Sequence, residues 1–220
     1  MTRLETPKRF LRTLLYNRGF DIHSLPLPRL TLRSLEKDLP VLVDIKDPCI
    51  IDVGANRGQT IDLFLRSFRK PRIIAFEPNP KLAEILEARF RSLSTIAIEP
   101  RLLSTGAGQL NFKIFENDEL SSVLELDPAN DNPFAKTKLE RVITVEADTL
   151  DRYAKRHELD RIHLLKIDTQ GFDLEVLKGG SNLLEQNAVD VILIEVNFAK
   201  LYCGQSSFGE IERYLGDRGY

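Results

Sequence analysis

Residues 50–58 read IIDVGANRG, in which an apolar run ends in an acid and two glycines follow. Asp52 ends the run, and Gly54 and Gly58 come after it at a spacing of four. Glycine permits a sharp turn and leaves room for a ligand that lies against the backbone. A helix that begins near Gly58 would point free N–H groups and its positive dipole end at that ligand. The stretch therefore predicts a binding loop for a carboxylate or a phosphate.

A second acid follows the next apolar run, as Glu77 in the sequence AFEPNP. It lies about twenty residues beyond the loop, where a Rossmann-type site places the carboxylate that binds two ribose hydroxyls. The loop and Glu77 together predict a nucleoside-binding site. The alternative is a turn of the same shape that binds no ligand.

Two cofactors that contain a nucleoside compete for this site. A dinucleotide such as NAD favours the pattern GxGxxG, whereas position 56 is Asn. S-adenosylmethionine has no phosphate, and its amino-acid end needs an acceptor for the ammonium group and donors for the carboxylate. Asp52, Asn56 and backbone groups near them could supply both. We therefore predict that S-adenosylmethionine binds through Asp52, Gly54, Asn56, Gly58 and Glu77.

Polar side chains also mark the ends of two later apolar runs, with Asp168 after the first and Glu195 and Asn197 at the second. The carboxyl ends of parallel strands meet at one edge of a sheet, so these side chains should lie close together. Asp168 could be a general base for an attacking hydroxyl. Alternatively, the three oxygen-bearing side chains could hold Mg²⁺. The third possibility is structural, because acids also cap turns at strand ends.

Lys166 lies two residues before Asp168 and therefore on the same face of the strand. A lysine in this place would pair with Asp168 or Glu195 and keep that acid ionised. We predict Asp168 and Lys166 as the catalytic residues. In the part of the sequence before this strand, Ser121 and Ser122 could meet the acceptor, or lie in a solvated loop.

The elements that must position these residues alternate regularly. Apolar strands followed by amphipathic helices predict βαβ units, and hence an α/β, Rossmann-like, doubly wound and mostly parallel sheet. The expected strands are residues 49–53, 72–76, 95–99, 162–167 and 190–196, and the expected helices are residues 58–69, 79–91, 172–185 and 207–216. Two strand-like stretches, GQLNFKIFE and RVITVEADTL, interrupt the alternation and predict an inserted β-structure at about residues 105–147.

We divide the chain into an N-terminal helical extension with a linker, residues 1–45, and a Rossmann-like domain, residues 46–220. Residues 1–20 are basic and have a short apolar face at helical spacing. This helix could pack on the main domain, or it could associate weakly with an anionic membrane surface.

Three segments, DVGANRGQT, AFEPNP and KIDTQGFDLEVLKGG, together resemble the FkbM-type methyltransferases. The resemblance covers residues 50 to about 200, and the third segment is the most specific. It implies a class I fold that uses S-adenosylmethionine, and methyl transfer to a hydroxyl of a sugar, a lipid-linked glycan or a secondary metabolite. In this family the sheet normally continues with two more strands, which would fall beyond Tyr220.

The family pattern leaves other functions open. Without the final strands, the chain could be a non-catalytic binding protein, and the exposed sheet edge could pair two copies into a homodimer. A nicotinamide-dependent oxidoreductase is a weaker alternative, because neither GxGxxG nor a Tyr-x-x-x-Lys pattern is present. We expect the substrate to be a small molecule or a glycan acceptor.

Composition narrows the class of protein and its partners. The formal net charge of the 220 residues is −2, so no general attraction to nucleic acid is expected. The two cysteines, Cys49 and Cys203, have no partner at metal-ligand spacing. With no apolar stretch of membrane-spanning length and no signal-peptide core, we expect a cytoplasmic protein.

Overall fold

The structure is a computed structural model, and it describes residues 34–129 and 131–220. The basic helix expected in residues 1–20 and most of the predicted extension lie outside the described residues. The first described helix, α2 (Leu35–Val43), packs Leu39 and Val43 into the core beside the central sheet.

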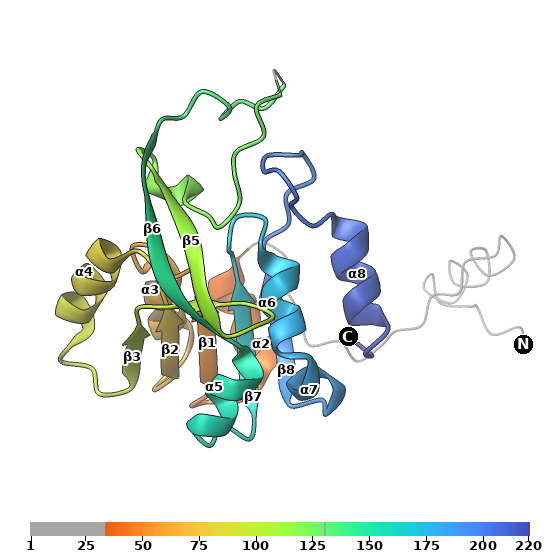
Figure 1. Ribbon diagram of the computed structural model, residues 1–220. Coiled ribbons are helices and arrows are strands. Elements are labelled where there is room, and N and C mark those ends of the chain that lie inside the picture. Colours follow the sequence, from red (N-terminus) through yellow and green to blue (C-terminus); the bar gives the residue numbers. More distant parts are fainter. Residues whose placement is uncertain (1–33, 130) are drawn as a thin grey trace, which may run out of the picture.

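Five parallel strands form the central sheet, in the order β3-β2-β1-β7-β8 (Figure 1). They are β1 (Cys49–Val53), β2 (Arg72–Phe76), β3 (Ile96–Glu99), β7 (Ile162–Ile167) and β8 (Val189–Ile194). The five expected strands thus match to within two residues, and the predicted Rossmann-like α/β fold is confirmed. From β1 the chain adds β2 and β3 on one side, and it then adds β7 and β8 on the other side of β1. Folds of this kind bind ligands at the point between β1 and β7 where the strand order reverses.

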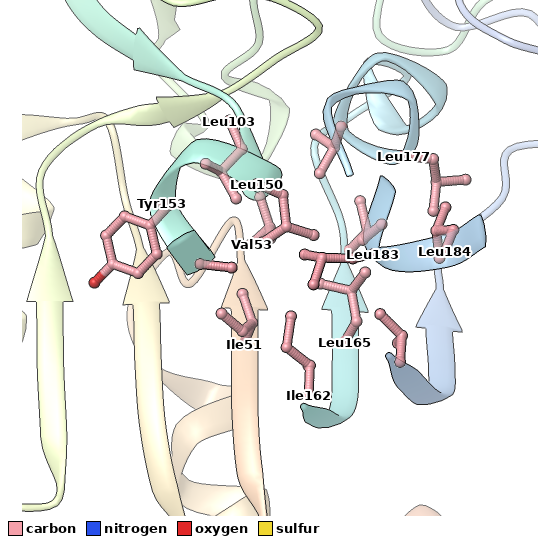
Figure 2. Packing of buried hydrophobic residues seen from close by; sticks show 14 of the residues in the cluster. Ile51, Val53, Leu103, Leu150, Tyr153, Ile162, Leu165, Leu177, Leu183 and Leu184 are labelled. Carbon is pink, nitrogen blue, oxygen red and sulfur yellow. The ribbon is translucent and has the colours of Figure 1, made fainter. Parts of the chain in front are cut away.

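Helices cover both faces of this sheet: α3 (Gln59–Ser67), α4 (Pro80–Phe90), α5 (Leu150–Arg156), α6 (Asp173–Gly179), α7 (Ser181–Glu185) and α8 (Phe208–Gly216). Alternate residues of β1 point to opposite faces. Ile50 packs with α2, α3 and α4, whereas Ile51 packs with α5, α6 and α7 (Figure 2).

The helix expected at residues 172–185 is two helices, α6 and α7, which meet at Gly179 and Gly180. A Cβ at Gly179 would lie 2.1 Å from the carbonyl oxygen of Ser104, and one at Gly180 would lie 2.9 Å from the Leu150 side chain. The chain therefore changes direction where a side chain would collide with neighbouring segments.

A second, three-stranded sheet follows β3 and has the order β4-β6-β5. It consists of β4 (Leu102–Leu103), β5 (Gly108–Phe115) and β6 (Leu139–Asp148), with a 3-10 helix η1 (Asp118–Leu120) after β5. Phe112, Ile114 and Val145 are the centre of its own apolar cluster. Figure 1 shows β5 and β6 running alongside the central sheet, with their connecting loop beyond the carboxyl ends of the parallel strands.

Strands β3 and β8 are the two outer strands of the central sheet. The expected homodimer through an open edge would use β8, and it stays a prediction that light scattering at several protein concentrations would test. None of the helices in the described part of the chain is both long and apolar enough to span a bilayer.

Candidate functional site

A cavity of about 340 Å³ lies at the carboxyl ends of β1, β2, β7 and β8. The glycine loop after β1 and the turn after β7 form part of its wall. Residues 101–103 and the segment after β5 complete the wall from the inserted sheet. Segments far apart in the sequence thus enclose one space at the place predicted for the ligand.

The loop after β1 passes so close to the backbone after β7 that only glycine can occupy position 54. Its φ is +80°, and a Cβ there would lie 1.9 Å from the carbonyl oxygen of Asp168. Gly58 has a φ of +85°, and its Cβ would lie 2.8 Å from Leu86. Gly54 is on the cavity wall, whereas Gly58 lies against α4 and outside the wall. The two glycines therefore shape the loop in different ways.

Asn56 continues this loop in a left-handed conformation, with a φ of 47°. Its backbone N–H donates to Oε2 of Glu77 at 2.7 Å, and its side-chain Nδ2 donates to the carbonyl of Asp118 at 3.4 Å. Its Oδ1 is buried and has no hydrogen-bond partner among the described residues. An unpaired buried acceptor on a cavity wall fits a ligand that brings a donor.

Glu77 follows β2 and lies on the cavity wall with only 4% of its surface exposed. Its two carboxylate oxygens accept the backbone N–H groups of Asn56 and Asn79. Burial raises the pKa of Glu77 to about 7, although these two hydrogen bonds work in the opposite direction. Each carboxylate oxygen can accept a further hydrogen bond, so Glu77 retains the capacity to bind hydroxyl groups.

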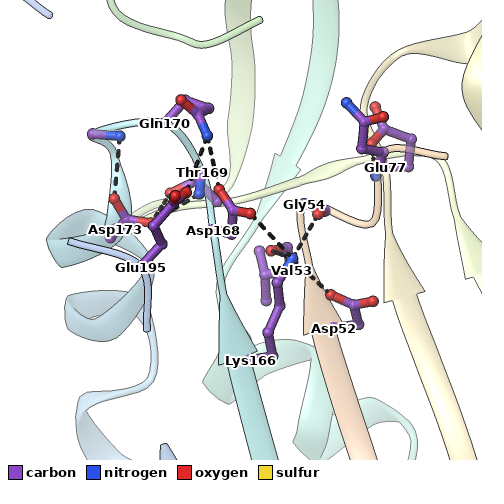
Figure 3. Close-up of polar contacts among 12 residues, drawn as sticks. Asp52, Val53, Gly54, Glu77, Lys166, Asp168, Thr169, Gln170, Asp173 and Glu195 are labelled. Carbon is purple, nitrogen blue, oxygen red and sulfur yellow. Dashed lines mark hydrogen bonds and ion pairs between the residues drawn. The ribbon is translucent and has the colours of Figure 1, made fainter. Parts of the chain in front are cut away.

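Lys166 lies between the carboxylates of Asp52 and Asp168 (Figure 3). Its Nζ lies 3.0 Å from Oδ1 of Asp52 and 3.7 Å from Oδ2 of Asp168. It also donates to the carbonyl of Gly54 at 2.8 Å. Burial lowers the pKa of Lys166, but the carboxylates of Asp52 and Asp168 raise it more. The net shift is upward, and Lys166 stays charged.

Asp52 itself is fully buried and does not belong to the cavity wall. Burial raises its pKa against the opposing effect of Lys166. Asp52 therefore affects the site by pairing with Lys166, which is on the wall. Its direct contact with the cofactor stays a prediction.

Asp168 and Glu195 meet on the cavity wall after β7 and β8, where Gln170 lies between them (Figure 3). The Nε2 of Gln170 donates to Oδ1 of Asp168 at 2.9 Å and to Oε2 of Glu195 at 3.2 Å. A hydrogen bond with Asp168, helped by burial, raises the pKa of Glu195 to about 7. Glu195 therefore changes its protonation state close to neutral pH, whereas Gln170 holds both acids in place.

The predicted Mg²⁺ ligands are not gathered into one site. The amide of Gln170, a donor, occupies the position between Asp168 and Glu195. Asn197 is not on the cavity wall, and its backbone carbonyl accepts Nε2 of Gln205 at 3.3 Å. Across residues 34–129 and 131–220, no three His, Cys, Asp or Glu side chains are placed to hold a metal ion. The residues present do not fit the metal hypothesis.

Residues 118–123, which follow β5, form a roof over the cavity, and from the sequence only Ser121 and Ser122 of this segment were considered as residues that could meet the acceptor. Asp118 forms an ion pair with Arg57 of the glycine loop. At the other end of the roof, the Tyr202 hydroxyl is within hydrogen-bonding distance of the Leu120 carbonyl, at 3.1 Å, and of Oε1 of Gln170, at 2.9 Å. The roof therefore spans from the cofactor loop to the carboxyl pair.

The serines of this segment have separate positions. Ser121 lies on the cavity wall, as expected for a residue that could meet the acceptor. Ser122 is buried, and its Oγ donates to the carbonyl of Gln170 at 2.9 Å. Gln170 comes from the KIDTQG segment, whereas no periodic pattern marked Tyr202 or Asp118.

Comparison with known proteins gives several matches. Residues 52–220 match the methyltransferase FkbM domain family. The chain is 25% identical over 178 residues to the 2-O-methyltransferase NoeI of Sinorhizobium fredii, covering 78% of this chain and 72% of that one. It is 28% identical over 153 residues to the hexuronic acid methyltransferase AglP of Haloferax volcanii, covering 69% and 57%.

A solved structure of a methyltransferase FkbM from Methylobacillus flagellatus also matches, with 16% identity and a TM-score of 0.46. This match covers 67% of the present chain and 32% of the solved one.

The parallel sheet and the cavity at its switch point define a Rossmann-like protein with a candidate ligand site at the carboxyl ends of its strands. Because the family match covers most of its length, the chain belongs to the FkbM methyltransferase family. It is a methyltransferase, and the family resemblance predicted from its three motifs is confirmed.

Proposed function

We propose that this protein is an S-adenosylmethionine-dependent O-methyltransferase, and that its acceptor is a hydroxyl of a sugar, a glycan or a secondary metabolite. Relatives named as a 2-O-methyltransferase and a hexuronic acid methyltransferase support this acceptor class. The observation that carries the proposal is the shared cavity, in which the Gly54 loop and Glu77 lie beside the Asp168–Glu195 pair.

The cofactor half of the cavity fits S-adenosylmethionine, which supplies the methyl group when bound. Glu77 would accept the ribose hydroxyls, because its carboxylate lies on the wall and is held by two backbone N–H groups. The unpaired Oδ1 of Asn56 would accept a donor of the amino-acid end. Gly54 keeps the wall free of a side chain at this point.

In the acceptor half, the carboxyl pair would take the proton of the attacking hydroxyl. Asp168 or Glu195 would hold the acceptor hydroxyl and receive its proton as the oxygen becomes methylated. Lys166 stays charged and lies 3.7 Å from Asp168, so the ion pair holds that side chain in place. Lys166 is thus a positioning residue rather than a base.

Variants of the carboxyl pair test this assignment. Asp168→Asn and Glu195→Gln should each lower kcat by roughly 10²- to 10⁴-fold, because a positioned base contributes that much. The affinity for S-adenosylhomocysteine should stay near its original value. A fall in cofactor affinity equal to the fall in kcat would contradict a role in proton transfer.

Titration calorimetry of the purified chain tests the proposal as a whole. We expect S-adenosylmethionine and S-adenosylhomocysteine to bind and NAD not to bind. EDTA or added Mg²⁺ should not change the affinity, since Gln170 lies between the two acids. If neither sulfur compound binds, the proposed cofactor is wrong. If both bind but no acceptor is methylated, the protein is a non-catalytic relative of the family.

We also propose a reducing, cytoplasmic location, which is supported by the two free cysteines, Cys49 and Cys203. Fractionation of cells that produce the protein tests this location.

A further inference from the structure

We infer that the acceptor is an uncharged sugar, and that carboxylates around the acceptor half of the cavity exclude sugars that carry a carboxylate or a phosphate. This inference rests on the proposed function, because it concerns the acceptor of the same cavity. It distinguishes between acceptor types that the similar proteins leave open.

Acids outnumber bases on the cavity wall. The acids are Glu77, Asp118, Glu119, Asp168 and Glu195, and the bases are Arg101 and Lys166. Glu77 belongs to the cofactor half, beside the glycine loop. Asp118 lies at the end of the roof that contacts the glycine loop, whereas Glu119, Asp168 and Glu195 lie farther along the roof and after β7 and β8, around the acceptor half.

Each base on or beside this wall already has an acidic partner. Lys166 pairs with Asp52 and Asp168, as described above. Nε of Arg101 lies 3.1 Å from Oε2 of Glu99. Arg57, which is next to the wall, pairs with Asp118 of the roof. Each of these three cations is therefore already balanced by at least one carboxylate, and among them the Nε of Arg101 makes no hydrogen bond within the described residues.

Glu119 is the acid most available to an acceptor. Its side chain is exposed and lies on the cavity wall, and it has no ion-pair partner among the described residues. The residues on either side fix its place, because the Asp118 carbonyl accepts Asn56 and the Leu120 carbonyl accepts Tyr202. Glu119 thus lies in the roof between the cofactor loop and the carboxyl pair.

These side chains suit hydroxyl groups. Carboxylates are acceptors only, and a sugar hydroxyl can donate to them. The wall also offers amides at Gln59 and Gln170, which can both donate and accept. A neutral polyol satisfies such groups, whereas an acceptor carboxylate would face like charge on several sides. Like charges brought together across a binding site are unfavourable, and salt weakens the effect.

Matched glycosides test the inference. We would measure methyl transfer from radiolabelled S-adenosylmethionine at pH 8 to p-nitrophenyl glucoside and glucuronide, and to p-nitrophenyl galactoside and galacturonide. Each pair differs only in a CH₂OH or a carboxylate. We expect kcat/KM to be at least about tenfold higher for the neutral member, and the ratio to shrink as salt is added.

Two charge variants sharpen the test. Glu119→Gln removes one charge from the wall and keeps the side-chain size. The ratio of kcat/KM for the neutral glycoside to that for the acidic one should therefore fall about threefold. Glu140→Gln removes one charge from β6, where the side chain is exposed and lies outside the wall. This control should leave the preference as it was.

Three results have distinct meanings. A glucuronide methylated as well as or better than the glucoside would overturn the inference. So would a protein that binds S-adenosylhomocysteine yet methylates neither member of either pair. A protein that does not bind S-adenosylhomocysteine would instead remove the proposed function, and this inference with it.

Discussion

The two halves of the cavity differ in how firmly the fold holds their acids. Behind the wall of the cofactor half, Asp52 is 0% exposed and pairs with Lys166, and on this wall Glu77 is 4% exposed and accepts backbone N–H groups. In the acceptor half, Glu119 and Glu195 are exposed, and side chains from separate loops hold this part together.

The difference has a structural origin. The cofactor half is built on adjacent parallel strands, whose register places Asp52 beside Lys166. The acceptor half is built from the inserted segment and from loops after β7 and β8, which tolerate change better than strands do. A fixed cofactor half and a replaceable acceptor half would allow one family to methylate different acceptors.

The largest effect is expected where the two halves are joined, at Lys166. Lys166→Met leaves Asp52 buried without its partner and should lower the free energy of unfolding by about 3–5 kcal/mol. Urea denaturation followed by circular dichroism measures this change. The double variant Asp52→Leu with Lys166→Met should regain most of the loss. If the single and double variants are equally stable, the loss in Lys166→Met does not come from the unpaired charge of Asp52.

The pH dependence of stability tests how deeply the cofactor half is buried. Glu77 has a pKa of about 7 in the folded protein, raised from 4.5 by burial. Between these values the folded state binds more protons than the unfolded state, so the free energy of unfolding falls as pH rises. The fall from Glu77 is on the order of 3 kcal/mol. Glu77→Gln should flatten the curve between pH 4.5 and 7, and an unchanged slope would contradict the raised pKa.

Removing Glu77, the residue proposed to bind the ribose, should lower the free energy of cofactor binding by a similar amount. Glu77→Ala should reduce the affinity for S-adenosylhomocysteine by about 100-fold, as expected for hydrogen bonds to a charged group. Titration calorimetry measures the affinity, and circular dichroism checks that the variant is folded. Glu87→Ala, on the exposed side of α4, is the matched control. Unchanged binding to Glu77→Ala would refute the ribose assignment.

The smallest effect is expected in the acceptor half, at Tyr202. Tyr202→Phe removes a buried hydroxyl that contacts Leu120 and Gln170, and should cost about 1 kcal/mol of stability. KM for the acceptor should rise, while the affinity for S-adenosylhomocysteine should stay the same. A matching loss of cofactor affinity would show that the two halves are not independent.

Much of the fold and the cofactor loop could be predicted from the sequence. The five parallel strands and the glycine loop are encoded locally, by apolar periodicity and by glycines that follow a strand. The inserted strands also showed their own alternation. The helix at residues 172–185 was predicted as one element, because the close approach of Ser104 and Leu150 to Gly179 and Gly180, where the two helices meet, involves residues distant in the sequence.

The acceptor half was harder to predict. Asp168, Glu195 and Lys166 were expected to lie close together, and they do. The bridging role of Gln170 was not expected, and it is why a metal site at Asp168, Glu195 and Asn197 does not fit. Tyr202 lies in a loop and Glu119 in the single turn of η1, and segments this short carry no periodic signal that would indicate which residues face a cavity.

The sequence by itself determined the class of fold, the family and the residues at the strand ends, because short-range patterns specify each of these. Only the tertiary structure decided which acids are buried and paired and which remain open to an acceptor. Burial and pairing depend on neighbours from distant segments, such as Lys166 for Asp52 and Arg57 for Asp118. The charge of the acceptor site, and with it the inferred choice of a neutral sugar, is therefore a property of the folded chain.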